Sequence, residues 1–241
     1  MGINTKEILE VKNLSAGYMG MKVLDKISLK LEKGEIVAIV GPNGSGKTTV
    51  LRCMVGLIEE YGGRIYEGEI IYGKKIINGK KPHELLSLGI AFVPDGGKVF
   101  PNMSVLENLE MGGYLFSEKK ILDKRINDVL ELFPILKGLI KRRAGSLSTG
   151  ERQILSLARA LITNPKVLLL DEPSLGLSPN YTRILFEKLL QLKEYCGIIV
   201  VEQNAKIALG YSDRGYLIRN GIVSFEGNAK MLLEKEDVFK L

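Results

Sequence analysis

The segment from residue 41 to residue 49 constrains this chain more than any other. It reads GPNGSGKTT, which fits the pattern GxxxxGK followed by Ser or Thr, and it comes directly after an apolar, β-rich run at residues 36–40. Glycines let the backbone fold tightly enough for several N–H groups to converge on an anion, where a Cβ would obstruct the approach. The pattern therefore predicts a P-loop that binds phosphate, between a strand and a helix.

The residues of this loop have separate expected roles. The Lys47 ammonium can reach the outer phosphates of a nucleotide, and the Thr48 hydroxyl can ligate Mg²⁺. The helix should begin at Lys47, run to about Leu57 and point its positive end at the same phosphates. A plain glycine-rich turn is the alternative, but such a turn needs neither the Lys-Thr pair nor the third glycine. The other residues expected to bind the nucleotide here are Gly41, Pro42, Asn43, Gly44, Ser45, Gly46 and Thr49.

Length and composition fit one globular domain with an inserted lobe. The 241 residues are 45% hydrophobic and 26% charged, which is ordinary for a protein able to bury a sizeable core. The longest apolar runs are far too short to span a bilayer, and residues 1–6 lack the apolar core of a signal peptide. Cys53 and Cys196 have no paired spacing, which indicates a reducing compartment. We therefore expect a cytosolic protein unless another chain holds it at a membrane.

Short apolar runs alternate with helical patterns along the chain, which predicts an α/β fold with a mostly parallel sheet covered on both faces. The N-terminal part should be rich in β-structure, and a hairpin should form from residues 68–72 and 75–77. The other expected strands are residues 8–11, 26–31, 36–40, 90–93, 167–170 and 198–201.

From Asp95 to about Leu161 the pattern turns helical. Capping boxes at Ser104 and Ser148 open two of the expected helices, and apolar residues recur at helical spacing through residues 118–133. We expect this segment to form a helical lobe that interrupts the α/β core. The predicted division is a nucleotide-binding core at about residues 1–94 and 164–241, with the helical lobe at about residues 95–163.

An acidic pair follows the apolar run at residues 167–170. Asp171, at the tip of the expected strand, can hold Mg²⁺ through water. Glu172, directly after it, can polarise or deprotonate the water that attacks the γ-phosphate. Taken alone, an acidic pair after a strand is weak evidence. Together with the P-loop it becomes strong evidence for nucleotide hydrolysis.

The third element is the stretch LSTGE at residues 147–151, at the start of a helix and about twenty residues ahead of the acidic pair. Alone it is a capping box, but it resembles the LSGGQ signature of ATP-binding-cassette (ABC) ATPases. The order of P-loop, helical segment, signature and acidic strand resembles that family over essentially the whole chain. The resemblance implies a P-loop NTPase cassette with a mostly parallel core sheet, an antiparallel β subdomain and an inserted helical subdomain.

The resemblance also implies how ATP is held. Tyr18 would stack on adenine, and two subunits would pack head to tail. ATP would then lie between the P-loop of one subunit and the signature of the other. The signature residues implied as ATP ligands are Ser148, Thr149, Gly150 and Glu151.

Several positions depart from the commonest pattern of the family. Asp95 stands where glutamine is usual, Thr149 replaces a glycine and Glu151 a glutamine, and Gln203 stands where a histidine usually contacts the γ-phosphate. Asp95 can still ligate Mg²⁺ through oxygen, and the Gln203 amide can still donate a hydrogen bond to phosphate. Gln203 therefore joins Glu172 and Lys47 as an expected catalytic residue.

These departures point in one direction. The stretches at residues 92–101, 171–179 and 201–205 resemble one of the two ATPase subunits of branched-chain amino-acid importers, and urea-type importers share much of the pattern. The implied protein uses ATP and Mg²⁺ at the cytoplasmic face of the cell membrane. Its implied partners are two multi-span permease subunits, a sister ATPase or a second copy of itself, and, indirectly, an extracytoplasmic substrate-binding protein.

The rival interpretation is a soluble, non-transport ABC ATPase that acts on nucleic acid or the ribosome. The net charge of +6 favours it mildly, but the basic residues are spread out and their densest cluster, at residues 141–143, is short. Such proteins usually carry two cassettes, long coiled coils or cysteine-rich inserts, and this sequence has none of these. We therefore expect no nucleic-acid partner.

Overall fold

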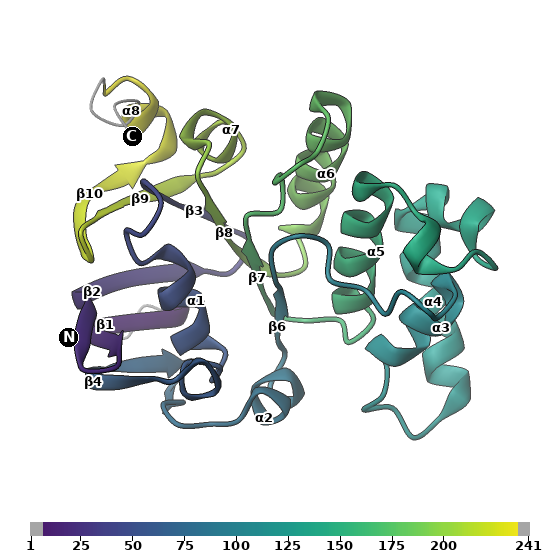
Figure 1. The fold of residues 1–241 in the computed structure, drawn as a ribbon, viewed down its shortest axis with the longest axis horizontal. Coiled ribbons are helices and arrows are strands. Elements are labelled where there is room, and N and C mark those ends of the chain that lie inside the picture. The colour runs from purple at the N-terminus through teal and green to yellow at the C-terminus, as the bar shows by residue number, and fades with distance from the viewer. Residues whose placement is uncertain (1–6, 236–241) are drawn as a thin grey trace.

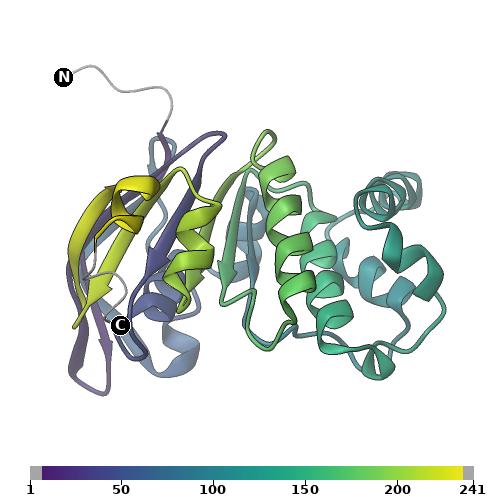
Figure 2. The same ribbon diagram turned by 90° about the horizontal axis from the view of Figure 1, so that it is seen from above.

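The computed structural model describes residues 7–235, so the sequence-based expectation about residues 1–6 lies outside the described part. Two sheets form the framework. The four-stranded sheet has the strand order β2-β1-β4-β5, and the six-stranded sheet has the order β10-β9-β3-β8-β7-β6. In Figures 1 and 2 the four-stranded sheet and the helices α3 and α4 lie at opposite ends of the molecule, with the six-stranded sheet between them.

The four-stranded sheet is antiparallel throughout and is larger than the sequence indicated. Its strands are β1 (Glu7–Tyr18), β2 (Met21–Glu32), β4 (Gly63–Tyr72) and β5 (Lys75–Ile76). The expected strands at residues 8–11 and 26–31 are each part of a strand of 12 residues. Register shifts at Leu14 and Ala16 interrupt the alternation of apolar and polar residues, which explains why the sequence pattern indicated shorter strands. The expected hairpin of β4 and β5 is confirmed.

The six-stranded sheet is parallel except at its edge, where β10 pairs antiparallel with β9. Its strands are β3 (Ile36–Val40), β6 (Ile90–Val93), β7 (Val167–Asp171), β8 (Gly197–Glu202), β9 (Arg214–Arg219) and β10 (Ile222–Asn228). Every residue of β3, β7 and β8 is buried, as expected for strands that are covered on both faces. Because β3, β7 and β8 are parallel neighbours, the segments that follow them meet at one edge of the sheet.

Helices cover both faces of this sheet. The predicted capping boxes at Ser104 and Ser148 are confirmed, and Ser178 is the N-cap of α6. The first helix, expected to reach about Leu57, ends earlier at Met54, because Gly56 adopts a left-handed φ of +69°. Between residues 7 and 235 the α-helices are α1 (Lys47–Met54), α2 (Pro82–Ser87), α3 (Val105–Gly112), α4 (Lys119–Leu132), α5 (Thr149–Leu161), α6 (Pro179–Leu192), α7 (Ala205–Gly210) and α8 (Ala229–Leu233), and short 3₁₀ helices lie at Glu59–Tyr61, Pro134–Leu139 and Ala144–Ser146.

Two large apolar clusters lie on opposite faces of the parallel sheet. Leu169 and Val201 belong to the cluster that faces α1 and the antiparallel sheet. Leu168 and Val200, their neighbours along the strands, belong to the cluster that faces α3, α4, α5 and α6. This alternation is the period of two that a strand imposes on its side chains. The division into a nucleotide-binding core and a helical lobe stays a prediction.

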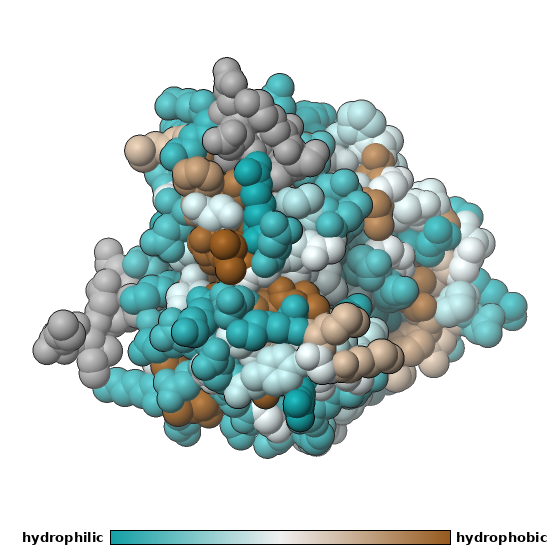
Figure 3. Space-filling model, turned by 60° about the vertical axis from the view of Figure 1, so that its left-hand side comes forward, coloured by the Kyte–Doolittle hydropathy of each residue, from teal (hydrophilic) through white to brown (hydrophobic). Residues whose placement is uncertain are grey.

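One side of the molecule has a mostly polar surface (Figure 3). Figure 3 shows the side of the molecule that carries β1, β2 and β10 as largely hydrophilic, with separate apolar patches. Exposed apolar side chains of this region include Met19, in the turn between β1 and β2, Met21 at the start of β2, and Ile222 on β10. Within residues 7–235 there is no helix of the length and apolar character that crossing a bilayer requires.

Candidate functional site

The P-loop runs from the end of β3 into α1, as the sequence predicted. Two of its glycines, Gly41 and Gly46, are required by close approaches to neighbouring elements. A Cβ at Gly41 would lie 2.1 Å from the carbonyl oxygen of Ile218, and one at Gly46 would lie 2.5 Å from Leu24 Cδ2. Gly46 also has a left-handed φ of +104° directly before α1. The loop is therefore held tightly between β9 and β2.

The groups inside this loop fit a phosphate anion. Lys47 is only 4% exposed, and its ammonium donates hydrogen bonds to the carbonyl oxygens of Gly41, at 2.8 Å, and Pro42, at 3.0 Å. The Ser45 hydroxyl is buried and has no hydrogen-bond partner. A cavity of about 380 Å³ is lined by Val23, the residues from Asn43 to Thr49, and Glu172. A buried hydroxyl without a partner and a buried ammonium beside it are what an anionic ligand would satisfy.

Thr48 and Asp171, two of the predicted Mg²⁺ ligands, are in direct contact. Thr48 Oγ1 donates a hydrogen bond of 3.0 Å to Asp171 Oδ1. Burial raises the pKa of Asp171 to about 6, against the opposing hydrogen bond from Thr48, and the nearby charges of Asp95 and Glu172 raise it further. Carboxylate and hydroxyl oxygens are donors suited to Mg²⁺, and a cation here would offset the crowded negative charge.

The third predicted ligand, Asp95, lies after β6 and is exposed, but its charge acts on Asp171. Among the described residues no group of three or more His, Cys, Asp or Glu side chains forms a metal site. The oxygens of Thr48 and Asp171 would therefore supply only part of the coordination. This fits an ion that is also bound by substrate phosphates and water.

Glu172 lies on the wall of the P-loop cavity, as a group that activates water must. Its φ is +42°, in the left-handed region that non-glycine residues seldom occupy. Its N–H donates a hydrogen bond of 2.8 Å to the carbonyl oxygen of Val201, at the end of the neighbouring strand β8. The backbone of Glu172 is therefore fixed by the strand beside it.

The end of β8 carries one predicted residue and one that sequence reasoning missed. Gln203, predicted to contact phosphate, is exposed directly after the strand. Glu202, before it, is only 3% exposed, and its Oε1 accepts a hydrogen bond of 2.8 Å from Ser174 N. The signal that could have identified it is a carboxylate at the end of a strand whose other residues are uncharged.

Burial perturbs the other charged groups of the site. Burial lowers the pKa of Lys47, while the charges of Glu172, Asp171 and Glu202 act in the opposite direction. Burial raises the pKa of Glu202, hydrogen bonds from Ser174 lower it, and the charge of Glu172 raises it. Three carboxylates thus share the neighbourhood of one ammonium. Perturbed groups of this kind, gathered at one cavity, are typical of functional sites.

Tyr18, the predicted adenine-stacking residue, is at the end of β1 and is attached to α1. Its hydroxyl donates to Thr49 Oγ1 at 3.4 Å and accepts from Arg52 Nη1 at 3.2 Å. The Arg52 guanidinium also lies 3.8 Å from the centre of the Tyr61 ring. Arg52 is a second residue that the sequence did not single out, because its partners are distant along the chain.

The structure does not bring the predicted signature residues to the P-loop of the same chain. None of residues 148–151 lines the P-loop cavity. Ser148 and Glu151 instead form the capping box of α5, in which the Ser148 N–H donates to Glu151 Oε2 at 2.7 Å. Thr149 Oγ1 accepts from Arg152 at 3.4 Å, and Gly150 packs against the Tyr181 ring.

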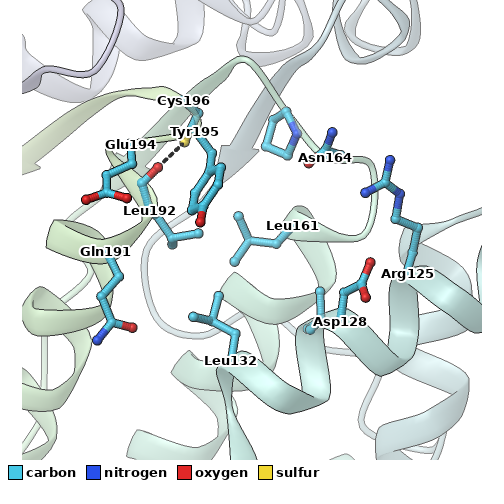
Figure 4. A pocket seen from close by; sticks show the side chains of 12 residues that line it. Arg125, Asp128, Leu132, Leu161, Asn164, Gln191, Leu192, Glu194, Tyr195 and Cys196 are labelled. Atoms are coloured by element: carbon cyan, nitrogen blue, oxygen red, sulfur yellow. Dashed lines mark hydrogen bonds between the residues drawn. The ribbon is translucent and has the colours of Figure 1, made fainter.

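Cavity size does not locate the phosphate site. A cavity of about 630 Å³ lies between α4, the end of α5 and the end of α6 (Figure 4). Its apolar lining includes Leu132, Leu161 and Leu192, and none of its lining residues is a predicted site residue. It adjoins Cys196, which precedes β8, whereas the phosphate site lies where the parallel strands end.

Comparison with known proteins agrees with this geometry. The family described as ABC transporter matches residues 24–175. The probable branched-chain amino acid transport ATP-binding protein LivF of Archaeoglobus fulgidus is 40% identical over 236 residues, which are 97% of this chain and 98% of the relative. The high-affinity branched-chain amino acid transport ATP-binding protein BraG of Pseudomonas aeruginosa is 40% identical over 233 residues, which are 96% of this chain and 97% of the relative.

A solved structure has the same fold. The crystal structure of an ATP-binding cassette of an ABC transporter in its ADP conformation superposes with a TM-score of 0.86 at 32% sequence identity, covering 98% of both chains. The expected cassette fold is thereby confirmed. From the match to the family, the likeness to its solved cassette and the geometry of the phosphate site, we conclude that this chain belongs to the ABC transporter family and is one of its ATPases.

Proposed function

We propose that this chain is the ATP-hydrolysing subunit of an importer of branched-chain amino acids. The observation that carries the proposal is the cavity at the P-loop, which is lined by Lys47, Thr48 and Glu172, together with the hydrogen bond from Thr48 to Asp171. The cargo is inferred from LivF and BraG, whose names state branched-chain amino acid transport and which align along nearly the whole chain.

In this proposal the P-loop binds the phosphates of ATP through its backbone N–H groups and the Lys47 ammonium. Thr48, Asp171 and Asp95 would hold Mg²⁺. When bound, this ion would neutralise part of the negative charge on the phosphates. The Glu172 carboxylate accepts the proton of the attacking water. The Gln203 amide donates a hydrogen bond to the γ-phosphate but takes up no proton.

A complete site needs a second ATPase subunit. Residues 148–151 do not line the P-loop cavity of their own chain, although they begin a helix of 13 residues whose N-terminal end suits a phosphate. This arrangement supports a head-to-tail dimer in which the signature of one subunit closes the ATP site of the other. The second subunit is a sister ATPase or another copy of this chain.

The membrane subunits would dock beside the loop that follows β6. A cavity of about 300 Å³ there is lined by Phe92, Phe100, Met111, Tyr114 and Arg159, among others. Phe100, Met111 and Tyr114 are 41%, 40% and 59% exposed, so aromatic and apolar surface is available to a partner. We place two multi-span permease subunits on this face, at the cytoplasmic side of the membrane. An extracytoplasmic binding protein would be reached only through them, and no nucleic acid takes part.

The test is purification of the chain from gently solubilised native membranes, followed by uptake measurements. We expect two multi-span proteins and a second cassette ATPase to co-purify, and the reconstituted complex to take up leucine, isoleucine and valine when ATP is present. Uptake of urea alone would contradict the cargo. Recovery with ribosomes or nucleic acid, without membrane proteins, would contradict the transport function.

A further inference from the structure

Glu202 is a buried carboxylate whose position needs an explanation. It ends β8, whose other residues, Gly197, Ile198, Ile199, Val200 and Val201, carry no charge. A carboxylate that is only 3% exposed loses most of its hydration, and this loss is offset only by hydrogen bonds or charges inside the protein. A well-packed apolar residue would avoid that cost. The contacts of Glu202 therefore indicate what it contributes.

The carboxylate of Glu202 is attached to the chain that follows Glu172. Ser174 N donates a hydrogen bond of 2.8 Å to Glu202 Oε1. The intervening residue is Pro173, which has no N–H, so Ser174 has the first backbone donor after Glu172. One residue earlier on β8, the Val201 carbonyl oxygen accepts a hydrogen bond from Glu172 N at 2.8 Å. Two successive residues of β8 thus hold the segment of Glu172 at both of its ends.

This segment is held in an uncommon conformation. Glu172 has a φ of +42°, and a non-glycine residue remains in that region only where its surroundings determine the conformation. The two hydrogen bonds to β8 are such a determinant. They also hold the backbone from which the Glu172 side chain reaches the wall of the P-loop cavity. Glu202 and Glu172 are near enough for their charges to act on each other.

We propose that Glu202 is a positioning residue for ATP hydrolysis. Its carboxylate accepts the Ser174 N–H and so holds Glu172 in the left-handed conformation from which the Glu172 carboxylate reaches the attacking water. The inference rests on the proposed function, in which Glu172 accepts the proton of that water. It adds that the end of β8 acts on hydrolysis through Glu202 as well as through Gln203.

The test compares three substitutions in the full ATPase complex. Glu202→Ala removes the acceptor, Glu202→Gln keeps an acceptor oxygen without the charge, and Glu202→Asp keeps the charge but withdraws it by one methylene. We expect Glu202→Ala and Glu202→Asp to lower kcat about 10- to 100-fold with little change in KM for ATP, as for a small misplacement of a reacting group. Glu202→Gln should retain most of the activity.

Glu35 supplies a matched control. It is also buried, at 8% exposure, and its Oε2 accepts a hydrogen bond of 2.8 Å from Glu32 N, but it lies before β3, at the opposite end of the sheet from the phosphate site. Glu35→Ala should lower the unfolding temperature and leave kcat of the folded protein unchanged. If Glu202→Ala does not fold, Glu202→Gln and Glu202→Asp decide the question, because their rates are expected to differ.

A second experiment separates this inference from the proposed function. In a Glu172→Gln background, Glu202→Ala should lower the residual rate by less than about twofold, because residues that act as a unit are not additive. An unchanged kcat in Glu202→Ala, or equal losses in Glu202→Ala and Glu202→Gln, would overturn the positioning role. A parental rate in Glu172→Gln would instead remove Glu172 as the base, and with it the proposed mechanism.

Discussion

Thr48 Oγ1 and Asp171 Oδ1 are joined by a hydrogen bond of 3.0 Å, although the two residues are 123 positions apart in the sequence. The bond connects the start of α1 to the end of β7. It places a hydroxyl and a carboxylate side by side, and Thr48, which carries the hydroxyl, lines the P-loop cavity. We expect Mg²⁺ to enter at this contact, because both groups offer oxygen ligands and the substrate phosphates lie next to them in the proposed complex.

Replacing Thr48 tests this expectation. Thr48→Ala should reduce Mg²⁺-dependent ATP hydrolysis at least about tenfold and raise the Mg²⁺ concentration required for half-maximal rate. Thr48→Ser retains the hydroxyl and should retain most of the activity. The measurement is a titration of ATPase rate with Mg²⁺ at saturating ATP. A normal Mg²⁺ requirement in Thr48→Ala would exclude the hydroxyl as a ligand.

Replacing Glu172 tests the proposed base. Glu172→Gln preserves the size of the side chain and removes its ability to accept a proton. We expect this variant to bind ATP and remain a closed dimer, while its turnover falls by a factor of about 10² to 10⁴. ATP binding by equilibrium dialysis and dimer formation by size-exclusion chromatography would check the first two points. Steady-state phosphate release would check the third.

We predict that Arg52 holds Tyr18 in position to stack on adenine, the role that the family resemblance implies for Tyr18. Its guanidinium lies over the Tyr61 ring and donates to the Tyr18 hydroxyl. Arg52→Lys keeps the positive charge but loses the planar group that makes both contacts. The hydrogen bond to Tyr18 contributes about 1 kcal/mol, so KM for ATP should rise about 2- to 10-fold with kcat nearly unchanged.

Arg64 provides the control for this prediction. Its guanidinium lies 5.0 Å from the centre of the ring of Tyr66, a residue with no predicted role in nucleotide binding. Arg64→Lys should therefore leave KM for ATP unchanged. Equal KM values in the two variants would mean that Arg52 does not support the nucleotide.

Local patterns predicted much of this molecule, and long-range contacts explain what they missed. The P-loop and the capping boxes at Ser104 and Ser148 are recognisable because all their groups lie within a few residues. Arg52 is 34 positions from Tyr18, and Glu202 is 28 positions from Ser174. Their roles depend on which distant backbone or ring lies beside them, and a single sequence does not state that.

The two cysteines should be unreactive in the folded protein. Burial raises the pKa of Cys53 to about 12 and that of Cys196 to about 11. The thiolate is the reactive form, and at about pH 8 only a very small fraction of either thiol is ionised. Alkylation by iodoacetamide should therefore be slow in the native state and fast after unfolding in guanidinium. Rapid modification of the native protein, measured by mass spectrometry, would contradict the burial of the modified residue.

The pH dependence of hydrolysis tests the role of Gln203. An amide does not titrate, whereas a histidine changes charge near pH 6.5, within the working range of most enzymes. The parental enzyme should therefore show no step near about pH 6.5 that depends on position 203. Gln203→His should introduce such a step into the plot of kcat against pH, because its imidazole would occupy the position from which the amide meets the γ-phosphate.

Gln203→Asn, which offers the same amide on a shorter side chain, is the control and should lower kcat without adding a step. An unaltered profile in Gln203→His would mean that this side chain does not meet the reacting phosphate, and hydrolysis would then depend at this edge of the sheet on Glu172 and the residues that hold it.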